Sequence, residues 1–351
     1  MHPQFGQLMA EATALTRAGD LPAAMAAITA ALNGSPVAAE RVQEAPGHNV
    51  IDVVARVVEE AVAPPVARPA TAPQGERFLT GHYAHHAGKR DYRLFIPATR
   101  HDKPRALVLM LHGCTQSPDD FARGTRMNAL GAEHNTLVLY PAQTRHANSQ
   151  GCWNWFKHNH QGRNRGEPAL LADMTRHIAE SHGVDPGHIY VAGLSAGGAM
   201  AAILATTHPD VFAAAGVHSG LPAGAARDLP GALAAMQGQA GSGLAGTAKS
   251  EVRMIVFHGD ADATVHPSNG ERVVAAHGGT AVSVEEQHGL QHGNRTCTRR
   301  LHKDAQGQVV TEQWRLHGAG HAWSGGDPSG SYTDARGPDA SAEMMRFFLQ
   351  T

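Results

Sequence analysis

One pentapeptide does most to constrain the fold of this chain: residues 193–197 read GLSAG, with Ser195 at the centre. An apolar run precedes it and a stretch rich in Ala and Met follows. This pattern predicts a strand over 188–192, a sharp turn, and a helix over 196–208. Glycines on both sides of the serine let the neighbouring chain pass close, so the hydroxyl projects beyond the strand beside the helix N-terminus. Such a serine is suited to attack a carbonyl carbon.

Two further strand ends supply the partners that a catalytic serine needs. These partners are required evidence, because a chain with 39 glycines can contain the pentapeptide by chance. The apolar run 252–257 leads into Asp260 and Asp262, and the run 311–316 leads into His321 between small residues. Serine, aspartate and histidine in this chain order are typical of α/β-hydrolases. We therefore predict Ser195 as nucleophile, His321 as base and Asp262 as the residue that orients the imidazole. Asp260 is the alternative, although its place directly after a glycine suits capping of the turn.

The oxyanion hole is predicted from a fourth strand. Residues 106–111, ALVLML, contain no polar side chain, which is typical of a strand buried on both faces. The loop HGCTQ follows at 112–116. In α/β-hydrolases one oxyanion N–H comes from this loop and the other from the residue after the nucleophile. We expect these to be the backbone amides of Cys114 and Ala196.

Four segments in matching order resemble the polyhydroxybutyrate depolymerase family of esterases, which is related to feruloyl and acetylxylan esterases. They are 112–116 (HGCTQ), 151–156 (GCWNWF), 189–200 (IYVAGLSAGGAM) and 320–326 (GHAWSGG). The resemblance implies an α/β-hydrolase fold, the triad of Ser195, Asp262 and His321, and an oxyanion amide at Cys114. It further implies hydrolysis of short-chain hydroxyalkanoate polyester or its oligomers, with feruloyl or acetylxylan esters and small soluble esters as alternatives.

The chain contains three cysteines, Cys114, Cys152 and Cys297. The family resemblance implies a disulfide between Cys114 and Cys152 that braces the oxyanion loop and leaves Cys297 free. Composition by itself favours three reduced thiols in a cytosolic protein. The sequence leaves both alternatives open.

Aromatic residues make up only 5% of the chain, yet Trp153, Trp155 and Trp323 all lie within the matched segments. Indoles beside a nucleophile suit an apolar acyl chain, a polyester strand or an aromatic acid. We expect these three residues to bind substrate, with a place in the core as the alternative. The histidine pairs 85/86 and 158/160 lack the Cys or acidic residues that zinc spacing requires, so neither a metal nor another cofactor is expected.

Charge and hydropathy exclude several classes of partner. The formal net charge of −2 gives no general attraction to nucleic acid or to an anionic membrane. No apolar run approaches the roughly 18 residues of a transmembrane helix. The first residues lack a basic segment, so no Sec signal peptide is expected and the cytoplasm is the default location. A disulfide would point instead to an oxidising compartment.

The chain divides into three parts. Apolar residues at helical spacing on both sides of a turn predict a small helical hairpin over 1–34. A Pro/Ala-rich linker with a short helix follows over 35–76, and the catalytic domain spans 77–351. A hairpin of this size cannot hold a core alone, so it should pack on the catalytic domain, on a second copy as a homo-oligomer, or on a polymer surface. A non-catalytic binding or scaffolding protein that uses the hairpin is the alternative from a different class.

Apolar runs within the catalytic domain alternate between strand and helix patterns. This alternation predicts an α/β fold with a mostly parallel central sheet flanked by helices. The expected strands are 92–96, 106–111, 136–140, 188–192, 252–257, 283–287 and 311–316, and the expected helices are 169–181, 196–208 and 340–349.

Overall fold

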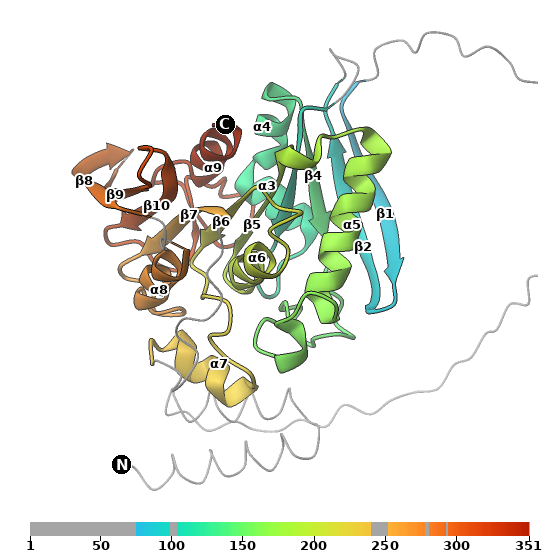
Figure 1. Cartoon of the computed structure of the whole chain (residues 1–351), viewed down its shortest axis with the longest axis horizontal. Helices are drawn as coiled ribbons and strands as arrows, with labels where there is room; N and C mark the ends of the chain where they lie inside the picture. The colour runs from blue at the N-terminus through green and yellow to red at the C-terminus, as the bar shows by residue number, and fades with distance from the viewer. Residues whose placement is uncertain (1–74, 99–103, 240–251, 278–280, 293, 351) are drawn as a thin grey trace, which may run out of the picture. The chain divides into compact units, whose positions relative to one another are not determined.

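The computed structural model describes residues 75–98, 104–239, 252–277, 281–292 and 294–350. Within these residues one ten-stranded sheet runs in the order β1-β2-β4-β3-β5-β6-β7-β10-β9-β8 (Figure 1). The predicted hairpin at 1–34 and the predicted linker up to residue 74 lie outside the described residues.

Parallel strands form the centre of the sheet. Every residue is buried in the four adjacent strands β4, β3, β5 and β6, as a strand covered on both faces requires. Antiparallel strands extend the sheet at both edges. The parallel strands are β3 (Ala106–Leu111), β4 (Thr136–Pro141), β5 (Ile189–Leu194), β6 (Ala214–His218), β7 (Arg253–Gly259) and β10 (Val309–Leu316); the edge strands are β1 (Arg77–His85), β2 (Gly88–Ile96), β8 (Ser283–His292) and β9 (Arg295–Lys303).

Helices cover both faces of the sheet (Figure 1). Alternate residues of β3 belong to two different cores: Leu107 and Leu109 pack with α5 and α6, whereas Val108 and Met110 pack with α3, α4 and α9. This period of two is what a strand between two layers of helices produces. The helices are α3 (Pro118–Thr125), α4 (Met127–Glu133), α5 (Gly166–His182), α6 (Ala196–Thr207), α7 (Leu229–Met236), α8 (Ser268–His277) and α9 (Ala340–Leu349).

The predicted α/β fold with a mostly parallel sheet is confirmed. Each expected strand and helix overlaps an observed one, and the bounds of β3 and α9 agree with the prediction. The sequence did not indicate strands β1, β6 and β9, helices α3, α4, α7 and α8, or the short two-stranded sheet of β11 (Trp323–Ser324) and β12 (Thr333–Asp334). Among the described residues, no helix is long and apolar enough to cross a bilayer.

Candidate active site

Ser195 occupies a tight turn between β5 and α6. Its backbone angles, φ 58° and ψ −118°, lie in a region that residues other than glycine rarely adopt. The glycines on either side are required by close approach: a Cβ atom at Gly197 would lie 2.0 Å from the Leu111 carbonyl oxygen, and one at Gly193 would lie 2.4 Å from the Gly197 carbonyl carbon. Such a backbone conformation costs on the order of 1–3 kcal/mol and is found mainly at functional sites. The turn therefore has the backbone geometry that the pentapeptide predicts for a nucleophile elbow.

The neighbouring strands hold this turn in place. The Ser195 backbone N–H donates to the carbonyl oxygen of His218 at the end of β6, at 2.9 Å. A Cβ atom at Gly113 would lie 3.7 Å from the Ser195 Cβ atom, so the loop after β3 lies directly against the serine. The predicted nucleophile and the predicted oxyanion loop are thus neighbours in space.

His321 and Asp262 form a hydrogen-bonded pair, with 2.8 Å between His321 Nδ1 and Asp262 Oδ2. The other carboxylate oxygen accepts the backbone N–H groups of Thr264 and Val265 at 2.9 and 2.8 Å. Burial by itself would raise the pKa of the Asp262 carboxyl, but the hydrogen bond and charge of His321 outweigh burial and lower it. The carboxylate is therefore ionised at neutral pH and accepts the hydrogen bond from the proton on His321 Nδ1.

The structure pairs Asp262, and not Asp260, with His321. Asp260 Oδ2 lies 2.8 Å from His317 Nδ1, and its Oδ1 accepts the Gly318 N–H at 2.7 Å. Asp260 thus caps the turn after β10, and not its own turn after Gly259 as its place in the sequence suggested.

The third link of the triad is not closed in this structure. Within the described residues, no hydrogen bond joins Ser195 Oγ to His321 Nε2. In serine hydrolases this contact is often long without substrate and tightens only in the complex. The role of Ser195 in a triad therefore stays a prediction, supported by the elbow geometry.

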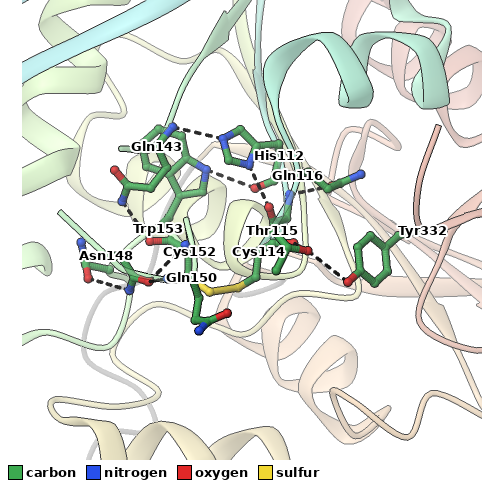
Figure 2. The surroundings of a disulfide bond; sticks show 12 residues. His112, Cys114, Thr115, Gln116, Gln143, Asn148, Gln150, Cys152, Trp153 and Tyr332 are labelled. Atoms are coloured by element: carbon green, nitrogen blue, oxygen red, sulfur yellow. Dashed lines mark hydrogen bonds between the residues drawn. A yellow bond between two sulfur atoms is a disulfide. The ribbon is translucent and has the colours of Figure 1, made fainter. Parts of the chain in front are cut away.

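A disulfide joins the oxyanion loop to the segment after β4 (Figure 2). Cys114 and Cys152 are bonded with an S–S distance of 2.05 Å, and Cys297 is a free buried thiol. This pairing confirms the one that the family resemblance implies. A second bond supports the loop, because the Thr115 N–H donates to the Gln150 carbonyl oxygen at 2.9 Å.

The backbone N–H groups of the two predicted oxyanion donors are not used by the fold of the described residues. Neither the Cys114 nor the Ala196 backbone N–H donates to an acceptor in the described part of the chain. Ala196 is the first residue of α6, where helical N–H groups have no partner within the helix. The Gly113 N–H, by contrast, donates to Gln116 Oε1 at 2.8 Å, which shapes the loop without using the Cys114 amide.

The expectation that three indoles bind substrate needs correction. Trp153 and Trp323 are 0% exposed and Trp155 is 5% exposed, so they offer little or no surface to a ligand. Trp153 Nε1 donates to the His112 carbonyl oxygen at 3.1 Å, and Trp323 Nε1 donates to Ser341 Oγ at 3.1 Å. These residues are close in sequence to the catalytic segments but support them from the core side. The alternative of a core role is the one that their burial fits.

Two buried histidines, which no sequence motif singled out, lie beside the site. His218 stacks between Phe257 and Trp323, and its Nε2 accepts the Ser324 N–H at 3.0 Å. Burial lowers the pKa of His218 to about 3, so it is a neutral structural group. His258 Nε2 lies 2.9 Å from the Val265 carbonyl oxygen and 3.5 Å from Asp262 Oδ2. His258 therefore fixes the loop that presents Asp262.

The site residues offer hydrogen-bonding groups and one serine hydroxyl. Among the residues that the structure describes, no three His, Cys, Asp or Glu side chains converge as a metal ion requires. The arrangement of a projecting serine, an Asp–His pair and two unbonded amides is suited to acyl transfer.

Comparison with known proteins gives the family. The family model described as "Esterase PHB depolymerase" matches residues 90–285. The chain is 30% identical over 230 residues to poly(3-hydroxyalkanoate) depolymerase C of Paucimonas lemoignei, a match that covers 61% of the chain and 54% of the relative. It is 31% identical over 285 residues to poly(3-hydroxybutyrate) depolymerase of Ralstonia pickettii, covering 72% and 55% respectively. The chain thus spans about half the length of these curated relatives.

Among solved structures, an acetyl xylan esterase from Aspergillus awamori has a TM-score of 0.57 at 21% identity, covering 74% of this chain and 93% of that one. At this level of identity the likeness shows a shared α/β-hydrolase fold and nothing finer. The family match is more informative, because it spans more than half of the chain and includes the oxyanion loop, the elbow and Asp262. By this match the chain belongs to the polyhydroxybutyrate (PHB) depolymerase family of esterases.

Proposed function

We propose that this chain is a serine carboxylic-ester hydrolase that works through an acyl-enzyme. The observation that carries the proposal is the positive φ of Ser195 in a turn that lies against the oxyanion loop, together with the 2.8 Å pair of His321 and Asp262. Family membership supports an ester as the substrate. No metal or organic cofactor is needed for this chemistry.

The proposed reaction has two similar halves. His321 Nε2 takes the proton of Ser195 Oγ as this oxygen bonds to the ester carbonyl carbon, and the Cys114 and Ala196 amides stabilise the oxyanion. Each such donor typically contributes about 3–4 kcal/mol in the transition state. The intermediate then expels the alcohol, which takes the proton from His321. A water molecule hydrolyses the acyl-enzyme by the same route and regenerates Ser195.

The favoured substrates are short-chain hydroxyalkanoate polyester and its oligomers. The names of the two bacterial relatives support this class. Acetylxylan esters are the second candidate, because fungal acetylxylan esterases also match the chain, at 25–27% identity over about half of it. Feruloyl esters and small soluble esters are the remaining alternatives. Since the chain spans about half of its polymer-degrading relatives, soluble oligomers should be tested beside the insoluble polymer.

A hydrolysis panel tests this proposal. The parent protein and Ser195→Ala are compared on p-nitrophenyl butyrate, a hydroxybutyrate trimer, PHB film, acetylated xylan and methyl ferulate. A fluorophosphonate probe is expected to label the parent protein at Ser195 and to leave Ser195→Ala unlabelled. We expect trimer hydrolysis to exceed that of methyl ferulate and acetylated xylan in kcat/KM. A parent protein that neither reacts with the probe nor hydrolyses any of these esters would favour the scaffolding alternative.

A further inference from the structure

The burial of the three indoles leaves another side chain to contact the substrate. Tyr332 is 47% exposed, and among the described residues it is the one aromatic side chain in the set of exposed large hydrophobics. The other members of this set are Leu79, Leu233, Val282 and Val284. An exposed aromatic ring beside a reactive centre is a common contact for substrate, because it gives a large rigid surface at low cost in conformational entropy.

Tyr332 lies between the two loops that carry the proposed catalytic groups. Its carbonyl oxygen accepts the Trp323 N–H at 2.7 Å, two residues after His321. Its hydroxyl lies 3.1 Å from Thr115 Oγ1, one residue after Cys114. Figure 2 shows the ring of Tyr332 reaching toward the oxyanion loop beside the disulfide. The ring is thus fixed at a point where the histidine loop and the oxyanion loop meet.

The backbone holds the ring in this exposed position. Tyr332 has φ 52° and Thr115 has φ 66°, both in the left-handed region that costs residues other than glycine on the order of 1–3 kcal/mol. The preceding Ser331 is anchored, because its N–H donates to Asp120 Oδ1 at 3.0 Å and its carbonyl oxygen accepts from Gln116 Nε2 at 3.0 Å. Keeping Tyr332 at the surface therefore costs free energy in two ways. Its backbone is strained, and part of its apolar ring is exposed to water. Such a cost is expected where a side chain has a function.

We propose that Tyr332 is a specificity-determining residue that contacts the part of the ester extending from the reacting carbonyl over the oxyanion loop. The group that it recognises is apolar: an alkyl acyl chain, the next repeat of a hydroxyalkanoate, or an aromatic alcohol. Since its hydroxyl is already bonded to Thr115, the ring contributes its face and edge. This proposal rests on the ester-hydrolase function proposed above.

Two substitutions distinguish the contribution of the Tyr332 ring from that of its hydroxyl. Tyr332→Gly removes the ring and fits the positive φ, so it should fold without strain. Tyr332→Phe keeps the ring and loses only the bond to Thr115. Val284→Ala is the control, since Val284 is 55% exposed on β8 and belongs to no part of the site. Thermal melts and the rate of fluorophosphonate labelling show that each variant is folded and has a reactive Ser195.

The kinetic test uses two ester series. One varies the acyl group over p-nitrophenyl acetate, butyrate and octanoate, and the other varies the alcohol over ethyl and 1-naphthyl acetate. For each series we compare the ratio of kcat/KM for the largest substrate to kcat/KM for the smallest. In Tyr332→Gly we expect this ratio to fall about tenfold in one series, through a higher KM for the largest substrate. Loss of about 50 Å² of apolar contact predicts a change of this size. Tyr332→Phe should keep at least half of the parental ratio, and Val284→Ala all of it.

The outcomes distinguish this proposal from the proposed function. If the parent hydrolyses esters but both ratios in Tyr332→Gly stay within twofold of the parent, the role of Tyr332 is refuted and the esterase assignment stands. An equal loss in Tyr332→Phe also refutes it, because the hydroxyl and its bond to Thr115 would then be responsible. If the parent reacts with no fluorophosphonate and hydrolyses neither these esters nor any ester of the panel above, both proposals fall together.

Discussion

At the scale of single residues, Asp260 and Asp262 show how two identical side chains two positions apart acquire different roles. The Asp262 carboxylate is buried between His321 and two backbone N–H groups, whereas the side chain of Asp260 is 37% exposed and bonded to His317. A buried ionised carboxylate that accepts an imidazole N–H fixes the tautomer of the histidine. Asp260 has the same chemistry but faces a histidine outside the site.

This difference gives a prediction with a built-in control. Asp262→Asn should lower kcat on a soluble ester by about three to four orders of magnitude, because an amide in that place favours the wrong imidazole tautomer. Asp260→Asn should lower kcat by less than about tenfold, since only a turn loses its cap. Steady-state kinetics on p-nitrophenyl butyrate measure both. A larger loss in Asp260→Asn than in Asp262→Asn would reverse the assignment.

The residue scale is also where prediction from sequence was least complete. Sequence alone could indicate the positions of Ser195, Asp262 and His321, because each follows a strongly apolar strand. The end of a parallel strand fixes where the next residues lie. The direction of a side chain within a loop is not fixed in this way. Trp323 was therefore expected in the site and lies in the core, whereas Tyr332, in a polar segment without a motif, lies beside the oxyanion loop.

At the scale of elements, strands with strongly apolar sequences were predicted well, and strands stabilised by their partners were missed. Strand β6 (AAGVH) has few residues of high β-propensity, and it forms between β5 and β7 with Gly216 packed closely on Met344. Strand β9 (RTCTRRLHK) is rich in basic residues that look exposed in sequence. In the sheet its Arg299 pairs with Glu312 of β10 and its Arg300 with Glu286 of β8. Cross-strand charge pairs of this kind depend on register, which a single sequence does not reveal.

The disulfide joins two elements, and the prediction about it belongs to this scale. Cys152 is also held by other bonds, since its carbonyl oxygen accepts from Gln143 Nε2 at 2.9 Å, and the Asn154 N–H donates to the buried Glu167 at 2.7 Å. Cys152→Ser should therefore loosen the oxyanion loop only in part. We expect kcat to fall by less than the roughly hundredfold that complete loss of one oxyanion donor costs.

Thiol titration and kinetics together measure this effect. The denatured, unreduced parent should show one free thiol, from Cys297, and three after reduction. Reduction of the parent should lower kcat to the level of Cys152→Ser. Three titratable thiols in fully active, unreduced protein would contradict both the bond and its proposed effect on the loop.

At the scale of the whole molecule, every predicted catalytic and oxyanion residue lies between residues 75 and 350. We therefore propose that the segment 1–74, with its predicted hairpin, serves assembly or attachment to a polymer surface. Its deletion should leave kcat/KM on p-nitrophenyl butyrate within a few-fold of the parent and change either the oligomeric mass or the adsorption to PHB film. Kinetics, light scattering and a film-binding assay measure the three quantities. A folded truncated protein with a hundredfold loss on the soluble ester would place the segment in the site.

Buried neutral histidines make the stability of the whole molecule depend on pH. Burial lowers the pKa of His218 to about 3 and, with the charge of Arg163, that of His208 to about 4; it also lowers the pKa values of His112, His258 and His277. Above about pH 6.5 these groups are neutral in both the folded and the unfolded chain, so their effect on stability is absent. Below about pH 6.5 the unfolded chain binds protons that the folded chain cannot bind. The free energy of unfolding therefore decreases as the pH is lowered.

His208 allows this effect to be measured away from the site. Between pH 7.5 and 5.0 a histidine with a folded pKa near 4 should reduce the free energy of unfolding by about 2 kcal/mol, and His208→Gln should remove that part of the pH dependence. The lost hydrogen bond to the Arg163 carbonyl oxygen destabilises the variant at both pH values and cancels in the difference. His288→Gln is the matched control, because the side chain of His288 is 71% exposed. Urea unfolding at the two pH values decides: equal pH dependence in parent and His208→Gln would show that His208 is not held neutral by burial.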